Sequence, residues 1–390
     1  MNANEPPWIW PRAAYVHLPF CAHHCGYCDF AVAVHRDDRR AAYLDALSRE
    51  LERAGTPQKV DTLFFGGGTP TFFTAQELER CLHALRTWFP QTAGQEFSVE
   101  ANPGTFDAEK LGVLRDAGLT RVSLGCQSFD PDVLRTLERD HAPADAHRAV
   151  ELLRGRDIAM SLDLIFGVPG QTLEQWSRDL DIALALEPDG VATYGLTFEK
   201  GTRLWKQRRD GVVHGLNEDL ELAMYEHAID RLEGAGYVHV ELSNFARPGK
   251  ECRHNHVYWA NEAHWGFGMG AAEYVRGRRC VNTRDLDTYI RRALAGTATA
   301  QQSETLEPRE RALETLGQNL RRRLGIERER FAIQTGFSLA ELGGAALERL
   351  VAWGLLQDDG RCVFLTRRGK CVADSVTAEF WKSSFREGVL

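Results

Sequence analysis

The chain has 390 residues, of which 43% are hydrophobic and 26% charged, a composition typical of a globular protein with one large domain and a small one. Its formal net charge of −8, from 47 basic and 55 acidic residues, argues against a protein built to coat nucleic acid. No apolar stretch approaches the roughly 20 residues that a membrane helix needs. Residues 1–7 lack the basic and apolar regions of a signal peptide. Nine cysteines without an export signal indicate a reducing compartment, so we expect a cytoplasmic protein.

The first two thirds of the chain alternate short β-branched or aromatic runs with amphipathic helical stretches. Strands are predicted at residues 13–18, 60–65, 96–101, 121–126, 158–165 and 191–196. Helices are predicted at residues 41–54, 75–88, 107–117, 132–153 and 172–186. Capping boxes at Thr74 and Thr172 introduce two of these helices. Strands joined by single helices form right-handed βαβ units and a parallel sheet, as a partial barrel or a doubly wound sheet.

Unusual residues at the ends of all six predicted strands distinguish these two arrangements. The strands lead into the cysteines at 21–28, the glycines at 66–68, and residues 100–104, 125–128, 167–170 and 194–195. In a parallel α/β barrel, the chemistry lies in the loops that follow the strands, all on one face. We therefore predict an α/β fold with a partial (β/α)6 barrel and a single site at the C-terminal ends of its strands.

The last 190 residues follow a different pattern. A helix at 217–234, a strand at 237–242 and a loop at 252–273 are followed by helices at 307–324, 338–343 and 345–353 and by a hairpin that turns at Asp359-Gly360. Helices followed by such a hairpin predict a small winged-helix-like α+β domain. DNA binding is not favoured, because the candidate recognition helix carries one cation, Arg349. We expect three parts: the barrel at 1–240, an extension at 241–300 and the winged-helix-like domain at 301–390.

Three cysteines, Cys21, Cys25 and Cys28, follow the first predicted strand with the spacing C-x3-C-x2-C. Three thiolates within eight residues cannot all form disulfides with one another, and they are soft-metal ligands. A cubane iron–sulfur cluster normally has four thiolate ligands, so three would leave one iron open to a small molecule. The alternative is a zinc site completed by a histidine. The candidates for that fourth ligand are His17, His23 and His24.

Polar residues and glycines at the other strand ends could orient a ligand of that open iron. The run Gly66-Gly67-Gly68 lets a ligand approach the backbone without interference from Cβ atoms. The polar candidates are Glu100, Gln127, Arg139 and Asp163. Each could instead be a structural hydrogen-bonding group. Asp163 is the strongest candidate, because an unpaired carboxylate within an apolar strand would be costly.

The segment Cys252–Trp259 reads Cys-Arg-His-Asn-His-Val-Tyr-Trp and contains residue types that ligate heme iron. Trp259 could stack on a macrocycle. Alternatively, His254 and His256 are hydrogen-bonded residues that pack against the barrel mouth. From the residues alone, this second interpretation is favoured.

These motifs together resemble the radical S-adenosylmethionine (SAM) superfamily. The matching segments read Tyr-Val-His-Leu-Pro-Phe-Cys from residue 15, Gly-Gly-Gly-Thr-Pro-Thr from 66, Glu-Ala-Asn-Pro-Gly from 100, Gly-Cys-Gln-Ser-Phe from 125 and Leu-Asp-Leu-Ile-Phe-Gly-Val-Pro-Gly from 162. They are similar to the branch that contains oxygen-independent coproporphyrinogen III oxidases and the HemW group of heme chaperones. The similarity extends over essentially the whole chain.

The resemblance implies a [4Fe–4S] cluster on Cys21, Cys25 and Cys28, with SAM chelating the fourth iron. Reductive cleavage of SAM would give methionine and a 5′-deoxyadenosyl radical. The residues that match the family's SAM contacts are Tyr15, Tyr27, Gly67, Gly68, Thr69, Glu100, Gln127, Arg139 and Asp163.

Two departures from the oxidase pattern favour the chaperone group. The oxidases carry a further cysteine two positions after the motif, where this chain has Phe30, and a longer N-terminal segment than the fourteen residues before Tyr15. In contrast, residues 254–259 match the H-N-x-x-Y-W motif that is implicated in heme binding by the chaperones. The resemblance thus makes His254 the leading heme candidate, followed by Cys252 and Tyr258.

The sequence therefore predicts a cytoplasmic heme chaperone that binds heme, a [4Fe–4S] cluster and SAM and delivers heme to an acceptor protein. A reductant protein such as flavodoxin or ferredoxin is a possible partner. Two alternatives stay open: a coproporphyrinogen III oxidase, which removes two propionate carboxyl groups anaerobically, and a radical SAM enzyme that opens or modifies heme.

Overall fold

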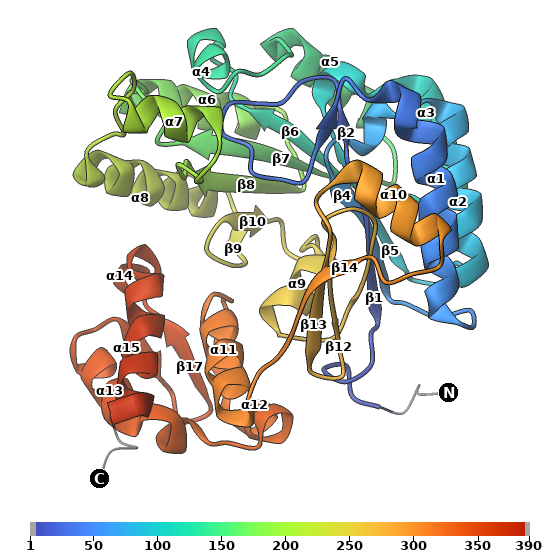
Figure 1. Cartoon of the computed structure of the whole chain (residues 1–390). Coiled ribbons are helices and arrows are strands. Elements are labelled where there is room, and N and C mark those ends of the chain that lie inside the picture. The colour runs from blue at the N-terminus through green and yellow to red at the C-terminus, as the bar shows by residue number, and fades with distance from the viewer. Residues whose placement is uncertain (1–4, 387–390) are drawn as a thin grey trace.

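The computed structural model describes residues 5–386, and the outermost ends of the predicted first and last domains lie outside this range. Its main feature is a nine-stranded sheet in the order β11-β1-β4-β5-β6-β7-β8-β10-β9 (Figure 1). The first seven are parallel: β11 (Trp265–Phe267), β1 (Ala13–Leu18), β4 (Thr62–Gly67), β5 (Glu96–Ala101), β6 (Arg121–Gln127), β7 (Ala159–Phe166) and β8 (Gly190–Gly195). The short strands β10 (Asn244–Ala246) and β9 (Val238–His239) are antiparallel.

Helices connect the parallel strands as the sequence predicts, and the partial barrel is confirmed. The connecting helices are α1 (Arg40–Leu51), α2 (Ala75–Trp88), α3 (Ala108–Asp116), α4 (Pro131–Thr136), α5 (Pro143–Leu153) and α6 (Leu173–Ala185). Both predicted capping boxes form. The Thr74 hydroxyl accepts the Glu77 N–H, and the Glu77 carboxylate accepts the Thr74 N–H. Thr172 and Gln175 form the same pair of bonds.

The single helix predicted at 132–153 is wrong, because the structure divides it into α4 and α5. Pro143 occupies the first turn of α5, where a missing N–H has no cost. The residue before a proline avoids the helical region, so Ala142 is extended (ψ 159°). The bend between the two helices carries Arg139 to the end of β6, where its guanidinium donates to the Gly125 carbonyl (2.8 Å).

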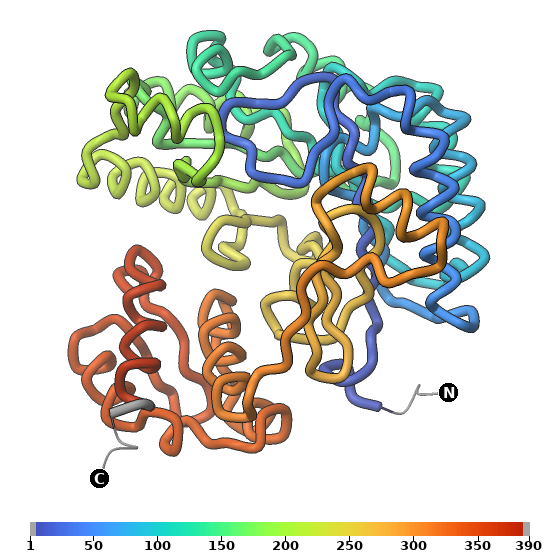
Figure 2. The backbone as a smooth tube through the Cα atoms, in the orientation of Figure 1, coloured from blue at the N-terminus to red at the C-terminus, as the bar shows by residue number. Residues whose placement is uncertain are grey.

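The predicted loop at 252–273 is also wrong. It contains α9 (Arg253–Trp259) and β11, and it ends in β12 (Ala272–Val275). Strand β11 pairs with β1 and adds a seventh parallel strand to the six predicted. Figure 2 shows this part of the chain returning beside the N-terminal strand. With three residues, β11 is too short to give a periodic signal. The strand predicted at 237–242 is reduced to the two residues of β9.

Further elements flank the sheet. They include α7 (Arg203–Arg209), α8 (Glu218–Gly234), α10 (Leu286–Leu294), and the strands β13 (Arg278–Asn282) and β14 (Ala300–Thr305), which form a second sheet with β12. The main hydrophobic core extends in sequence from Ala14 to Ala293, so the extension packs on the barrel core. No helix among residues 5–386 is long and apolar enough to cross a membrane.

The C-terminal part has a core of its own, between Ala312 and Phe380. Its elements are α11 (Pro308–Leu320), β15 (Ile326–Glu327), α12 (Arg328–Thr335), α13 (Leu339–Ala352), β16 (Leu356–Asp358), β17 (Cys362–Leu365), α14 (Arg367–Cys371) and α15 (Ala373–Arg386). The predicted hairpin is present as β16–β17, and the predicted break between two helices corresponds to non-helical Gly343 within α13. The Asn261 amide, beyond α9, donates to Thr315 (2.9 Å) and ties this part to the extension.

Candidate functional site

A cavity of about 540 Å³, here called the cluster-loop cavity, lies at the C-terminal ends of the parallel strands. Its walls include all three motif cysteines and eight of the predicted cofactor-binding residues. These eight are Tyr27, Gly67, Gly68, Thr69, Glu100, Gln127, Arg139 and Asp163. Two others, Tyr15 and His254, lie outside this lining. The parallel strands thus bring together residues separated by more than 140 positions, as the barrel prediction requires.

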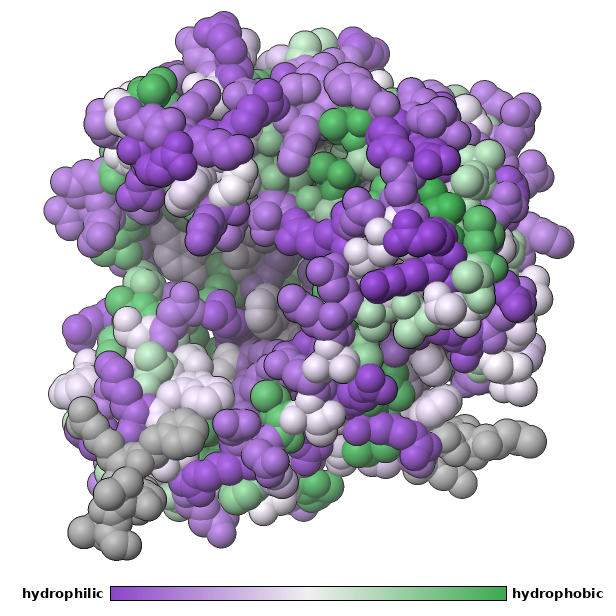
Figure 3. Space-filling view, in the orientation of Figure 1, coloured by the Kyte–Doolittle hydropathy of each residue, from purple (hydrophilic) through white to green (hydrophobic). Residues whose placement is uncertain are grey.

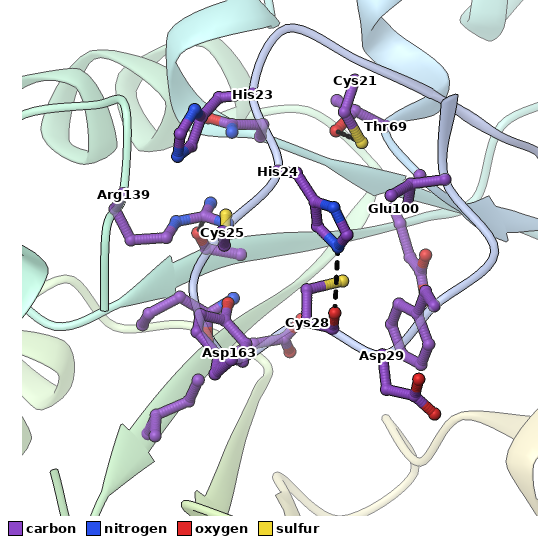
Figure 4. Close-up of a pocket in the computed structure, with 18 of the residues that line it drawn as sticks. Cys21, His23, His24, Cys25, Cys28, Asp29, Thr69, Glu100, Arg139 and Asp163 are labelled. Carbon is purple, nitrogen blue, oxygen red and sulfur yellow. Dashed lines mark hydrogen bonds between the residues drawn. The ribbon is translucent and has the colours of Figure 1, made fainter. Parts of the chain in front are cut away.

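The three thiols stand on one loop around the cavity wall (Figure 4). Cys21 Sγ lies 3.3 Å from the Thr69 hydroxyl, and the Arg139 guanidinium lies 3.4 Å from Cys25 Sγ. Burial raises the pKa of Cys21 to about 12 and that of Cys28 to about 11. These thiols are therefore protonated unless a cation such as iron compensates the thiolate charge.

The arrangement does not favour the zinc alternative. Within residues 5–386, no three His, Cys, Asp or Glu side chains are close enough together to hold one metal ion. The ring of His17 is buried, and both of its nitrogens are hydrogen-bonded. Its Nε2 donates to the Ala31 carbonyl (2.7 Å), and its Nδ1 accepts from the Tyr15 hydroxyl (3.1 Å). His24 bonds through Nε2 to the Cys28 carbonyl (3.0 Å). Two of the three candidate histidines are thus hydrogen-bonded to backbone carbonyls, whereas the three thiols share one cavity wall.

The glycine run forms a cradle beneath the loop. Gly66 and Gly67 continue β4 beyond its predicted end, and Gly67 has φ +113°, a region that favours glycine. A Cβ on Gly68 would stand 2.4 Å from the Pro19 carbonyl oxygen and 3.0 Å from Cys21 Sγ. A Cβ on Gly66 would stand 2.8 Å from the Glu100 carboxylate. The backbone here leaves no room for side chains, and the N–H groups of Gly67 and Gly68 are held by the Glu100 carboxylate and the Leu18 carbonyl (2.9 Å each).

Two half-buried carboxylates face the cavity from β5 and β7, the strands on either side of β6. The Glu100 carboxylate accepts the Gly67 N–H (2.9 Å), and the Asp163 carboxylate accepts the Ser123 hydroxyl (2.8 Å). Burial raises the pKa of each to about 7, against the opposing effect of these hydrogen bonds. A cationic ligand would favour their ionised forms. The costly buried carboxylate predicted at Asp163 therefore has a partner, Ser123, which the sequence did not single out.

Arg139 and Gln127 complete the wall. Despite burial, the pKa of Arg139 is raised because Tyr27 and Cys25 favour its charged form. Its Nε is buried without a hydrogen-bond partner in the described chain, which leaves a donor for a bound group. Gln127, at the end of β6, has φ +65°, an uncommon conformation for a residue other than glycine. Such strain is typical of functional sites.

Tyr15 lies behind the cavity wall. Its hydroxyl donates to His17, and its ring stacks on Phe64 with 6.1 Å between centroids. Burial raises its pKa well above the ordinary value, and Glu100 adds to this effect. In this structure Tyr15 therefore holds β1 against β4, beneath the loop that carries Cys21, Cys25 and Cys28.

The heme candidate His254 is fully buried on α9. Its Nδ1 lies 2.8 Å from the Thr62 hydroxyl and its Nε2 lies 2.8 Å from the Tyr258 hydroxyl. Its ring stacks on Phe64, with 5.0 Å between centroids, and burial lowers its pKa to about 3. The carboxylate of Glu96 accepts the backbone N–H of His254 (2.9 Å). The imidazole thus has the hydrogen-bonded packing role that the residues alone favoured.

A second cavity of about 110 Å³, here called the α9 cavity, lies further inside the barrel. From the segment 252–259, four residues line it: Cys252, Asn255, His256 and Trp259. The strands contribute alternate polar residues: Ser98 and Glu100 of β5, Arg121 and Ser123 of β6, and Ser161 and Asp163 of β7. Four residues line both cavities, namely Glu100, Ser123, Asp163 and Tyr194. The period-two pattern of these polar residues was a visible signal of a polar barrel interior.

The comparisons with known proteins agree with this geometry. Residues 15–183 match the model of the radical SAM superfamily, and residues 306–372 match that of the HemN C-terminal domain. The protein "Heme chaperone HemW" of Bacillus subtilis is 35% identical over 377 residues, which cover 95% of this chain and 99% of that relative. The chain belongs to the HemW family. A HemW of Mycobacterium tuberculosis is 37% identical, with 94% of each chain covered.

The chain is also similar to proteins with other names. The mitochondrial "Radical S-adenosyl methionine domain-containing protein 1" of Mus musculus is 31% identical over 93% of this chain and 86% of its own. Among solved structures, the coproporphyrinogen III oxidase HemN of Escherichia coli has a TM-score of 0.84 and covers 97% of this chain and 91% of its own. At 23% identity, that likeness shows the fold alone. The HemW relatives are therefore the better guide to function.

Proposed function

We propose that this chain is a heme chaperone, which binds heme on a radical SAM scaffold and transfers it to an acceptor protein. The observation that carries the proposal is the similarity to proteins named heme chaperone HemW along nearly the whole length of both chains. The α9 cavity supports it, because the polar barrel interior continues beyond the predicted SAM site to a segment with histidine, cysteine and tryptophan side chains.

The cluster-loop cavity is the proposed site of the [4Fe–4S] cluster and SAM. Cys21, Cys25 and Cys28 would ligate three irons. The proposed SAM contacts on the cavity wall are Tyr27, Gly67, Gly68, Thr69, Glu100, Gln127, Arg139 and Asp163. Tyr15, proposed from the same resemblance, lies behind this wall and bonds to His17. When bound, the cluster supplies an electron for reductive cleavage of SAM. The glycines keep this part of the cavity wall free of side chains, the half-buried carboxylates favour a positive charge on the ligand, and the Arg139 guanidinium stands beside Cys25.

Heme is the proposed cargo of the segment 252–259. The family resemblance makes His254 the first candidate for its ligand, with Cys252 and Tyr258 as further candidates. Ligation by His254 requires that its ring leave Thr62 and Tyr258, since both ring nitrogens are occupied by hydrogen bonds. The segment as a whole, with Cys252 and Trp259 on the α9 cavity, is the basis of the proposal.

Coproporphyrinogen III oxidase activity is the second candidate function, favoured by the likeness in fold to HemN. The residue at the position of the oxidases' extra cysteine is Phe30, whose side chain lines the cluster-loop cavity and is 64% exposed. An apolar ring at this mouth supplies no thiol to the site. This difference favours the chaperone over the oxidase.

The experiment that tests the proposal compares the two ligands on one preparation. The cluster-reconstituted chain is titrated with hemin and, separately, incubated with coproporphyrinogen III, SAM and reductant. Stoichiometric heme binding, transfer to an apo-hemoprotein and no protoporphyrinogen are expected. Turnover of coproporphyrinogen III would establish the oxidase instead, and loss of the heme absorption spectrum during SAM cleavage would indicate a heme-modifying enzyme.

A surface histidine provides the control for adventitious heme binding. His83 is exposed on α2 and lines neither cavity. The variant His83→Ala should bind hemin with the affinity and absorption spectrum of the unmodified chain. Loss of binding in this variant would mean that heme attaches to the surface rather than to the segment 252–259.

The partners and the compartment follow from the same proposal. The acceptor would be a protein that requires heme, and an electron-transfer protein such as flavodoxin or ferredoxin would reduce the cluster. We propose a cytoplasmic location from the cysteine content of the sequence, since free thiols are typical of reducing compartments. All nine cysteines are free thiols in the structure.

A further inference from the structure

Helix α9 directs its two histidines to opposite sides. Residues two apart on an α-helix are separated by about 200° around the axis. His254 faces β4 and is fully buried against Phe64. His256 faces the other way, into the α9 cavity. The two imidazoles of one short motif thus have different surroundings, although the sequence places them side by side.

The ring of His256 is available for a ligand. It is half-buried, and within residues 5–386 neither of its ring nitrogens has a hydrogen-bond partner. In contrast, His254 uses both ring nitrogens. A neutral imidazole with a free nitrogen is a good ligand for iron. Of the two histidines, His256 is the one that meets this condition without any rearrangement.

The surroundings of His256 match the other parts of a metalloporphyrin. Trp259 lines the same cavity and offers an apolar aromatic face, over which the Arg321 guanidinium lies at 5.6 Å. Lys250 and Arg121 also line the cavity. The Nε of Arg322 is buried without a hydrogen-bond partner in the described chain. Planar macrocycles stack on indoles, and the heme propionates are carboxylates that pair with such cations.

Acidic groups also approach this site and limit the number of free cations. Glu241 lines the α9 cavity, and its carboxylate is held by the Ser243 N–H (3.1 Å) and the Asn244 amide. Burial raises its pKa, which favours the neutral form. Glu96 is occupied by the backbone N–H groups of Arg253 and His254 (2.9 Å each).

Two of the cations already have carboxylate partners: Lys250 lies 3.7 Å from Asp189, and Arg321 pairs with Asp374. Glu100 and Asp163 line the cavity as well, so a bound propionate would take the place of existing partners of these cations.

From this arrangement we propose that His256, rather than His254, ligates the heme iron, with Trp259 against the macrocycle and Arg321, Arg322 and Lys250 beside the propionates. This inference rests on the proposed function. The α9 cavity is smaller than a heme, so one edge of the macrocycle enters it. The rest lies in the hollow that Figure 3 shows between the barrel and the C-terminal part. Arg321 and Arg322, which follow α11, belong to the C-terminal part and close the site from that side.

The experiment compares His256→Ala with His254→Gln by hemin titration of the cluster-loaded full chain. Glutamine can keep hydrogen bonds to Thr62 and Tyr258, so the second variant tests ligation without emptying the core. In His256→Ala we expect at least about tenfold weaker binding and a shifted Soret band, and added imidazole should restore the band. The variant His254→Gln should keep the spectrum of the unmodified chain.

Two results separate the failure of this inference from the failure of the proposed function. If the unmodified chain retains no heme, both the chaperone proposal and the His256 assignment are overturned. If the unmodified chain binds heme and His256→Ala keeps its spectrum, the assignment alone is overturned.

A second ligand tests the propionate contacts. Hemin dimethyl ester, whose propionates are blocked, should bind about tenfold more weakly than hemin to the unmodified chain, because charge-assisted hydrogen bonds are lost. In Arg321→Ala the difference between the two ligands should decrease. Equal affinity of the unmodified chain for both ligands would contradict the propionate assignment.

Discussion

The two cavities of the barrel differ in how their residues are presented. The cluster-loop cavity is built from loops that follow the strands, and the three cysteines on one loop all reach its wall. The α9 cavity receives its motif from a helix, so that His256 faces the cavity and His254 faces the core. A motif on a loop can bring neighbouring residues to one site, whereas a motif on a helix divides them between two faces.

The electrostatics of the two cavities differ as well. Glu100 and Asp163, whose pKa values are raised, line both cavities, and in the cluster-loop cavity they are joined by the guanidinium of Arg139. Cations surround the exposed side of α9, where Lys250 and Arg121 line the cavity and Arg321 covers Trp259. The α9 cavity also has a third carboxylate, Glu241, so it differs from the cluster-loop cavity by its added cations rather than by a lack of acidic groups.

The largest expected effect comes from removing a proposed cluster ligand, which should abolish the function of one cavity and leave the other intact. The variant Cys25→Ala should lose the visible absorbance of the iron–sulfur cluster, because thiolate ligands are essential to it. It should still bind hemin in the absence of SAM, since Cys25 does not line the α9 cavity. Absorption spectra before and after hemin addition measure both.

The matched control is Cys280→Ala, which removes a half-buried thiol on β13 that lines neither cavity. It should keep the cluster. A full-strength cluster band in Cys25→Ala would show that the ligand assignment is wrong.

A smaller effect is expected from filling the glycine cradle. In Gly68→Ala the new methyl group would stand 2.4 Å from the backbone carbonyl of Pro19, which cannot move aside as a side chain can. We expect the free energy of unfolding to fall by about 2–3 kcal/mol, as in other overpacked sites. Denaturant unfolding measures this change.

Gly112 offers the same substitution without a contact. It lies in α3, with nothing within 4 Å of a new Cβ. Because alanine is the better helix former, Gly112→Ala should raise the free energy of unfolding by about 0.5–1 kcal/mol. A stable Gly68→Ala chain with unchanged SAM affinity would contradict the cradle.

A pH effect of about tenfold is expected on SAM binding. Since the pKa values of Glu100 and Asp163 are raised to about 7, both carboxyl groups lose their negative charge as the pH falls from 8 to 6. A cationic ligand favours the ionised forms, so SAM affinity should decrease in that direction by about tenfold. Calorimetric titration of the cluster-loaded chain at several pH values measures the affinity.

The double variant Glu100→Gln with Asp163→Asn removes both titrating groups. Its SAM affinity should be low and nearly independent of pH between 6 and 8. If the pH dependence of the unmodified chain persists in this variant, another group is responsible.

The smallest effect is expected at the mouth of the cluster-loop cavity. Phe30 is 64% exposed, so Phe30→Cys should change the free energy of unfolding by less than about 0.5 kcal/mol. It should also leave the cluster absorbance unchanged and produce no protoporphyrinogen, since one thiol does not build an oxidase site. Gain of coproporphyrinogen III turnover would make this position decisive for the activity.

The sequence predicted most of the barrel, because buried parallel strands are continuous apolar runs whose ends can be located within two residues. It also placed the cysteines, Gly68, Glu100 and Asp163 on one face, because the ends of parallel strands meet there. It missed Ser123 and Ser161, although the alternation of polar and apolar residues in β6 and β7 indicated a polar interior.

The orientation of the two histidines could not be predicted from the sequence, for a physical reason. Which face of α9 becomes buried depends on Thr62, Phe64 and Glu96, which lie more than 150 positions earlier in the chain. A pattern of seven residues does not encode such long-range contacts. The division of 132–153 by Pro143, in contrast, was visible in the sequence.

Because the two cavities share a wall, binding of one proposed ligand would affect the affinity for the other. Glu100, Ser123, Asp163 and Tyr194 line both cavities, so with SAM and heme bound as proposed, a side chain that turned toward SAM would change the surroundings of the heme edge. Thermodynamic linkage makes such an influence reciprocal: the factor by which SAM alters heme affinity equals the factor by which heme alters SAM affinity. The heme-loaded and heme-free forms of the chain would then differ in their affinity for SAM, so SAM binding would depend on whether heme is bound.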